Sequence, residues 1–143
     1  MTNIVEKARD LAYRAHAGQL DKAGRPYIEH VARVAATVSD DPEAEAVAWL
    51  HDVLEDCPAF EEEFWCNQPS KITKAVDKMT RWPGLSVKHY YTRIRHNTLA
   101  LRVKLADIAD NSDEERLALL DPKTANRLRR KYKQALKALG VEA

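Results

Sequence analysis

Residues 48–56 read Ala48-Trp49-Leu50-His51-Asp52-Val53-Leu54-Glu55-Asp56, a stretch that combines an apolar face with several ionisable side chains. The apolar positions recur at helical spacing, which predicts a helix packed against a core. They are Val47, Leu50, Val53 and Leu54. The polar residues form two pairs four apart, His51 with Glu55 and Asp52 with Asp56, and such pairs share one face of a helix. We therefore expect an imidazole and three carboxylates beside a buried stripe.

This crowding of carboxylates has two interpretations. Neighbouring carboxylates repel one another and resist burial unless a cation compensates them. The helix macrodipole also disfavours negative charge at a C-terminus, where the stretch ends before Pro58. The helix alone leaves open a solvated acidic turn or a cation site.

Two further segments favour the cation site. Residues 102–111 are apolar nearly all round, which indicates a central helix, and Asp107 lies inside that run with Asn111 four residues on. Asp107 needs a partner, and Lys104 or a metal ion would supply one. His30 lies between Ile28 and Val31 near the start of another predicted helix.

Two imidazoles and two carboxylates thus come from three predicted helices. They belong to His30, His51, Asp52 and Asp107. Mixed nitrogen and oxygen ligands suit one divalent cation, Mn²⁺, Fe²⁺ or Zn²⁺, and the share of carboxylates favours Mn²⁺. Such a cation polarises a phosphoryl oxygen and lowers the pKa of a bound water. Glu55 and Asp56 would then handle protons, as base towards the water or acid towards a leaving group.

The rest of the chain is also predicted to be helical, with no segment that reads as a strand. We expect one compact all-α bundle over residues 1–143. The predicted helices span 3–17, 26–39, about 41–56, 59–66, 71–79, 86–96, 98–110, 113–120 and 122–139. Asp40 or Asp41, Asn97 or Thr98, and Asp121 are the expected N-terminal caps of three of these helices, and Gly140 ends the last one.

Composition excludes several classes of protein. No run of 18 apolar residues occurs, so no transmembrane helix is expected. The first residues become charged at once, which is unlike a signal peptide, and we expect a cytoplasmic protein. The net charge of +1 creates no general attraction to nucleic acid.

The last predicted helix is strongly basic and has two interpretations. It could form a wall for an anionic ligand, with Arg129, Arg130 or Tyr132 reaching a pocket, or it could be a solvated face. A helical module that binds RNA or another polyanion through this helix is the non-enzymatic alternative. The near-neutral charge and the lack of alternating aromatic and basic residues argue against that alternative.

Three strings of sequence carry a family resemblance. They are Ala15-His16-Ala17-Gly18-Gln19 with Lys22-Ala23-Gly24-Arg25-Pro26-Tyr27-Ile28-Glu29-His30, then Leu50-His51-Asp52-Val53-Leu54-Glu55-Asp56, and Val103-Lys104-Leu105-Ala106-Asp107 with Asn111. In this order they resemble the HD-domain superfamily of metal-dependent phosphohydrolases. Within it, they look like the hydrolase domain of RelA/SpoT enzymes and single-domain small alarmone hydrolases, and the resemblance runs from about residue 5 to residue 137.

The resemblance implies a helical HD domain that removes the 3′-pyrophosphate of guanosine tetra- or pentaphosphate with Mn²⁺. It implies that His30, His51, Asp52 and Asp107 hold the metal and that Glu55 and Asp56 serve the attacking water and proton transfer. Asn111 would position substrate or water. Lys22 and Tyr27 would lie on the nucleotide and phosphate side of the pocket, and Lys104 is a further candidate substrate contact.

Three positions depart from the family pattern. Asp21 stands where these hydrolases usually carry an arginine that packs on guanine, and an acid cannot replace a planar cation there. Ser112-Asp113 follows Asn111, where an arginine is often found two places on, and Val31 follows His30 in place of a proline. A second enzymatic expectation therefore keeps the metal site but changes the substrate to another nucleotide or phosphate ester, such as a nucleoside monophosphate or NADPH.

Overall fold

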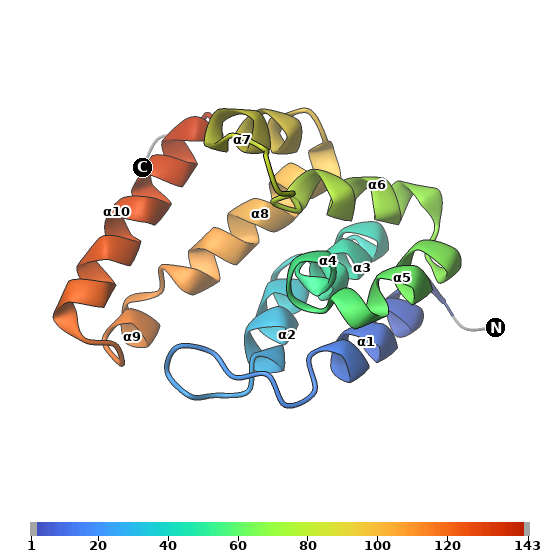
Figure 1. Cartoon of the computed structure of the whole chain (residues 1–143), viewed down its shortest axis with the longest axis horizontal. Helices are drawn as coiled ribbons and strands as arrows, with labels where there is room; N and C mark the ends of the chain where they lie inside the picture. The colour runs from blue at the N-terminus through green and yellow to red at the C-terminus, as the bar shows by residue number, and fades with distance from the viewer. Residues whose placement is uncertain (1–2, 142–143) are drawn as a thin grey trace.

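The computed structural model describes residues 3–141, and over that range the chain is helical without any strand (Figure 1). The elements in chain order are α1 (Ile4–Ala15), α2 (Ile28–Thr37), α3 (Pro42–Leu50), α4 (Val53–Asp56), the 3₁₀ helix η1 (Pro58–Phe60), α5 (Glu61–Asn67), α6 (Ser70–Met79), α7 (Val87–Arg95), α8 (Thr98–Asn111), α9 (Glu114–Leu117) and α10 (Pro122–Ala138). The predicted all-α class is confirmed. None of the helices in this range is long and apolar enough to span a membrane.

Helix α3 lies at the centre of the fold. Its residues from Ala46 to Leu50 are all buried, and it packs against α1, α2, α6 and α8. Several of these residues are alanines, whose small side chains let neighbouring helices approach closely. Asp41 caps the N-terminus of α3 by accepting from the backbone N–H of Glu43, as the sequence predicts. The segment that follows α3 is therefore held by packing on several sides.

Helix α8 is the second central element, and it contacts α2, α3, α6, α7 and α10. It begins after Asn97, whose side chain accepts from the backbone N–H of Ala100 at 2.9 Å. Asp107 is buried on this helix, about two and a half turns from its start. In Figure 1, α8 runs between the group of helices formed by α1 to α4 and the last helix, α10.

The loop between α1 and α2 is fixed by its own hydrogen bonds. Leu20 pairs with Pro26 across it, and the Asp21 carboxylate accepts from the backbone N–H groups of Ala23 and Arg25 at 2.9 Å each. Gly24 has a φ of 83°, a conformation that glycine adopts without strain. Because Pro26 belongs to this loop, α2 begins at Ile28 rather than at Pro26, where the sequence placed its start.

The continuous helix predicted through residue 56 is wrong. Helix α3 ends at Leu50, His51 and Asp52 form a turn, and α4 begins at Val53. Neighbouring residues on a regular helix point about 100° apart. The turn removes that restriction, with Asp52 at φ −109° and ψ 0°, and the His51 ring donates back to the carbonyl of Ala48 at 2.7 Å. Both side chains can then face the same point.

The contribution of the Asn97 cap to the stability of α8 can be tested by substitution. Asn97→Ala removes the side-chain acceptor and should lower the free energy of unfolding by about 1 kcal/mol, measured by urea denaturation. Asn97→Asp keeps an acceptor oxygen and should stay close to the parent. Equal losses in the two variants would show that the cap does not stabilise α8.

Candidate metal centre

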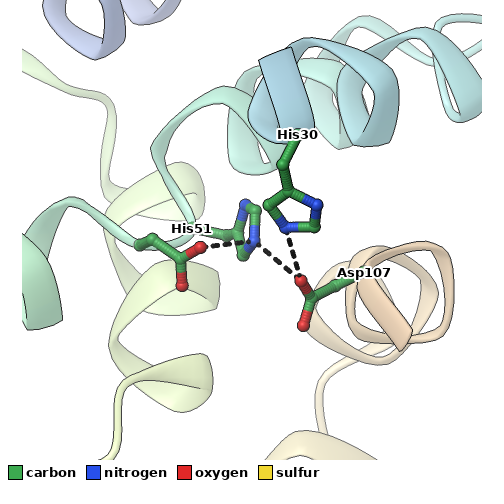
Figure 2. A group of neighbouring side chains, drawn as sticks. His30, His51 and Asp107 are labelled. Carbon is green, nitrogen blue, oxygen red and sulfur yellow. Dashed lines mark hydrogen bonds and ion pairs between the residues drawn. The ribbon is translucent and has the colours of Figure 1, made fainter. Parts of the chain in front are cut away.

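Four buried or nearly buried side chains meet where α2, the turn after α3, and α8 come together. The ligand atoms of His30, His51, Asp52 and Asp107 all lie within 4.8 Å of one another. His30 Nε2 is 2.9 Å and His51 Nε2 is 3.3 Å from the same oxygen of Asp107. Figure 2 shows both rings pointing at the Asp107 carboxylate from different elements. His51 Nε2 also lies 3.0 Å from an Asp52 oxygen.

The outer contacts of the two rings decide which nitrogens face the cluster. His51 Nδ1 lies 2.7 Å from the carbonyl oxygen of Ala48, which can only accept, so Nδ1 carries a hydrogen. His30 Nδ1 donates in the same way to Asp110, at 2.6 Å. Nε2 of each ring is therefore directed at carboxylate oxygens. Either this nitrogen also carries a proton, which makes the ring positive, or a cation lies between it and the oxygens. In the neutral rings these nitrogens offer lone pairs, which is the arrangement of histidine ligands oriented by an outer partner.

The carboxylates of the cluster are held in their charged form. Burial acts to raise the pKa of Asp52, but the neighbouring His51 lowers it to about 2. Burial is likewise opposed at Asp107, where Lys104 and both histidines hold the pKa well below its usual range. The same contacts raise the pKa of His30 and His51, so each ring holds a proton that a divalent cation would replace on binding the two carboxylates and the two imidazole nitrogens.

Three of the predicted substrate residues are bonded to these carboxylates. The hydroxyl of Tyr27 donates to Asp52 at 2.5 Å. Lys104 Nζ lies 3.0 Å from Asp107 and above the ring of Tyr90. Asn111 Nδ2 donates to Asp107 at 3.0 Å. These side chains orient the predicted ligands and also line the space beside them.

Asp110 is a site residue that the sequence analysis missed. Its carboxylate accepts from His30, from Arg33 at 2.8 Å and from Arg116 at 2.7 Å. Burial would raise its pKa, but these donors lower it to about 2. Asp110 lies one helical turn after Asp107, so its spacing in α8 is the one signal that could have placed it near the cluster.

Glu55 and Asp56, the predicted catalytic pair, have different surroundings. Asp56 lines a cavity of about 1040 Å³, whereas Glu55 accepts a hydrogen bond from the backbone N–H of Arg81. Loss of hydration and the charge of Asp52 raise the pKa of both carboxyls. A raised pKa makes a carboxylate a stronger base, which suits proton transfer.

The orientation of Asp56 depends on two residues before α2. Gln19 Nε2 donates to Asp56 at 3.2 Å, and its carbonyl oxygen lies 2.7 Å from Nδ1 of His16. His16 is fully buried and its Nε2 has no hydrogen-bond partner among residues 3–141. With its hydrogen on Nδ1, His16 donates to the carbonyl oxygen of Gln19, and its buried Nε2 carries no hydrogen that would need an acceptor. This tautomer therefore orients the NH₂ group of Gln19 towards Asp56.

The large cavity is bounded by the loop before α2 and by α2, α8, α9 and α10, and Lys22 lines it. A smaller cavity of about 160 Å³ reaches Asp52 and Asp107. Of the three residues of α10 named as pocket candidates, Tyr132 lines both cavities. Arg129 instead pairs with Glu114, at 2.7 Å, and Arg130 lines neither cavity.

Asp21, which departs from the family pattern, has a structural role in the wall of the large cavity. Besides bonding its own loop, the Asp21 carboxylate accepts a hydrogen bond from Nη2 of Arg116 at 3.3 Å. Arg116 in turn donates to Asp110 and to the side-chain oxygen of Asn111. A chain of ion pairs therefore joins the loop to the residue that orients His30.

The chain is similar to longer bacterial proteins. A guanosine-3′,5′-bis(diphosphate) 3′-pyrophosphohydrolase of Haemophilus influenzae is 30% identical over 92% of this chain and 22% of its own length. A protein of the same name from Vibrio cholerae is 33% identical over 84% of this chain and 19% of its own. A GTP pyrophosphokinase of Myxococcus xanthus is 34% identical over 55% of this chain. The chain thus spans about a fifth of the first two relatives, and no family model matches it.

Proposed function

We propose, from the relationship of this chain to the RelA/SpoT-type hydrolases, that it is a metal-dependent pyrophosphohydrolase. Its substrate would be guanosine tetra- or pentaphosphate, from which it would remove the 3′-pyrophosphate. The observation that carries this proposal is the convergence of His30, His51, Asp52 and Asp107 within 4.8 Å. We also propose that residues 1–143 form one HD-type hydrolase domain.

Some relatives are named as pyrophosphokinases, and the centre favours the hydrolase over that activity. Buried nitrogen and oxygen donors around one point suit the activation of water on a phosphoryl group. The strings of sequence that contain His51-Asp52 and Asp107 also resemble those of the hydrolase domain of RelA/SpoT enzymes.

The proposed metal ligands are His30, His51, Asp52 and Asp107, and Mn²⁺ is the ion that we propose for them. The donor set fits this ion because it joins two imidazole nitrogens with two carboxylates. When bound, a divalent cation polarises a phosphoryl oxygen and makes a water molecule a better nucleophile at neutral pH. The protein keeps the ligands aligned through Asp110, Tyr27 and Asn111.

Glu55 and Asp56 are the proposed proton carriers. Asp56 lies in the wall of the large cavity, where Gln19 orients its carboxyl, so it is placed to exchange a proton with a bound substrate. Glu55 lines neither cavity and accepts a hydrogen bond from the backbone N–H of Arg81, which fixes its carboxyl. We propose Lys22, Tyr27, Lys104 and Asn111 as the residues on the substrate side.

A second candidate keeps this chemistry but uses another nucleotide or phosphate ester, such as NADPH. The observation that favours it is the engagement of Asp21, whose two carboxylate oxygens are taken by the loop backbone and Arg116. This side chain is therefore held away from any interaction with a guanine ring. The two candidates differ in the substrate and in the product released.

A substrate panel with Mn²⁺, Zn²⁺ and chelator controls separates the two candidates. We expect pyrophosphate release from guanosine tetraphosphate, with Mn²⁺ required and chelator abolishing turnover. Orthophosphate release from other nucleotides, with guanosine tetraphosphate left intact, would favour the second candidate.

Removing one proposed ligand tests the metal centre directly. Asp52→Ala should abolish both Mn²⁺ binding, measured by calorimetric titration, and turnover, because the remaining donors no longer neutralise the ion. The circular dichroism of the helices should persist, since the variant removes one carboxylate and leaves the apolar core intact. Turnover that survives in this variant would count directly against the assignment.

Isosteric changes test the proton carriers. Glu55→Gln and Asp56→Asn keep an acceptor oxygen for Arg81 and Gln19, respectively, but lose the titratable proton. Each should lower kcat by a factor of about 10²–10⁴, while Mn²⁺ affinity stays near that of the parent. If both variants keep the parental kcat, neither carboxylate transfers a proton in the rate-limiting chemistry.

Asp110 provides a test of ligand orientation. Asp110→Asn weakens the hydrogen bond that fixes His30, so Mn²⁺ affinity should fall by about 10- to 100-fold. Asp113→Asn is the matched control, because Asp113 lines the same cavity without touching His30. Affinity that is equal in the two variants would exclude a role for Asp110 in holding the ligand.

A further inference from the structure

Lys131 of α10 stands where the two cavities meet. Four residues line both of them: Tyr27, Asn111, Lys131 and Tyr132. Lys131 therefore borders both the small cavity that reaches Asp52 and Asp107 and the large cavity beyond it. A ligand that extends from the metal centre into the large cavity would therefore lie beside Lys131.

Most other cations around these cavities already have a carboxylate partner. Arg33 and Arg116 are bound to Asp110, and Lys104 is bound to Asp107. In the part of the chain that the structure describes, no carboxylate lies within ion-pair distance of Lys131 or of Lys22. These two ammonium groups remain available to a ligand.

The surroundings of Lys131 are mainly positive. Burial lowers the pKa of Lys131, and the positive charges of Lys104 and Lys22 lower it further, while Asp107 opposes them. The three lysines come from separate elements, the loop before α2, α8 and α10. Lys104 is already paired with Asp107, so Lys22 and Lys131 are the two like charges that an anion between them would stabilise.

The kind of cation also indicates the ligand. Lysine offers a compact point charge, whereas arginine offers a planar fork that matches flat carboxylates and bases. A tetrahedral phosphate or a pyrophosphate carries several negative charges and can be contacted by ammonium groups from different directions. It can therefore lie between Lys22 and Lys131 without a fixed planar geometry.

We propose that Lys131, together with Lys22, forms a phosphate subsite at the junction of the two cavities. This inference rests on the proposed function and deepens it, because it assigns the residue that holds an anionic group of the substrate next to the metal centre. Lys131 is a binding residue in this assignment and takes no part in proton transfer.

The test is calorimetric titration of the full chain with inorganic pyrophosphate, in buffer that contains a chelator. Lys131→Ala is compared with Lys133→Ala, because Lys133 is exposed on the same helix, as Lys131 is, but lines neither cavity. We expect pyrophosphate affinity to fall at least tenfold in Lys131→Ala and to stay unchanged in Lys133→Ala. Lys131→Arg should recover most of the loss, and the melting temperature identifies any variant that fails to fold.

Equal pyrophosphate affinity in the two alanine variants, or no binding by the parent chain, overturns the subsite. Steady-state kinetics provide the second measurement, in which Lys131→Ala should raise KM about tenfold and leave kcat nearly unchanged. If pyrophosphate binds through Lys131 but no nucleotide is hydrolysed, the subsite stands and the proposed function fails. If nucleotides are hydrolysed with an unchanged KM in Lys131→Ala, the proposed function stands and the subsite fails.

Discussion

The site depends on one electrostatic constraint: two carboxylates, Asp52 and Asp107, are held close together in a mostly apolar interior. Such charges are tolerated only when they are compensated. Two histidines, Lys104, Tyr27 and Asn111 all direct polar groups at them. Because these partners come from α2, α8 and the turn after α3, the same contacts that neutralise the carboxylates also fix the relative positions of the three segments.

A second layer of charges extends this constraint to the cavity wall. Asp110 holds His30 on one side and two arginines on the other, and Arg116 continues to Asp21 in the loop before α2. Buried polar networks of this kind are rigid when every member has a partner. These contacts connect the loop beside the large cavity to His30, a proposed metal ligand. A change in the loop would therefore alter the position of His30 through the ion pairs.

The sequence predicted much of this arrangement because helical periodicity and caps are local. The all-α class follows from the apolar spacing, and Asp41, Asn97 and Asp121 cap the helices as expected. His30, His51, Asp52 and Asp107 were identified as a set and come together in the structure. The break at His51 was missed because it arises from long-range convergence: residues 51 and 52 must both face one point, and helical spacing forbids that.

The roles of Asp110, Arg116 and Gln19 could not be predicted from the sequence for the same reason. Their contacts join segments far apart in the chain, such as Arg116 with Asp21, and no local pattern indicates such pairs. The family pattern identified Asp21 as a departure but could not show that Arg116 engages it.

The most direct measurement of the central claim is a crystal structure of the chain with Mn²⁺, with the anomalous signal used to locate the ion. We expect one strong peak bound by Nε2 of His30, Nε2 of His51 and carboxylate oxygens of Asp52 and Asp107, with Nδ1 of His30 still on Asp110. A peak elsewhere, with these four side chains still bonded to one another and to the protein groups around them, would contradict this assignment.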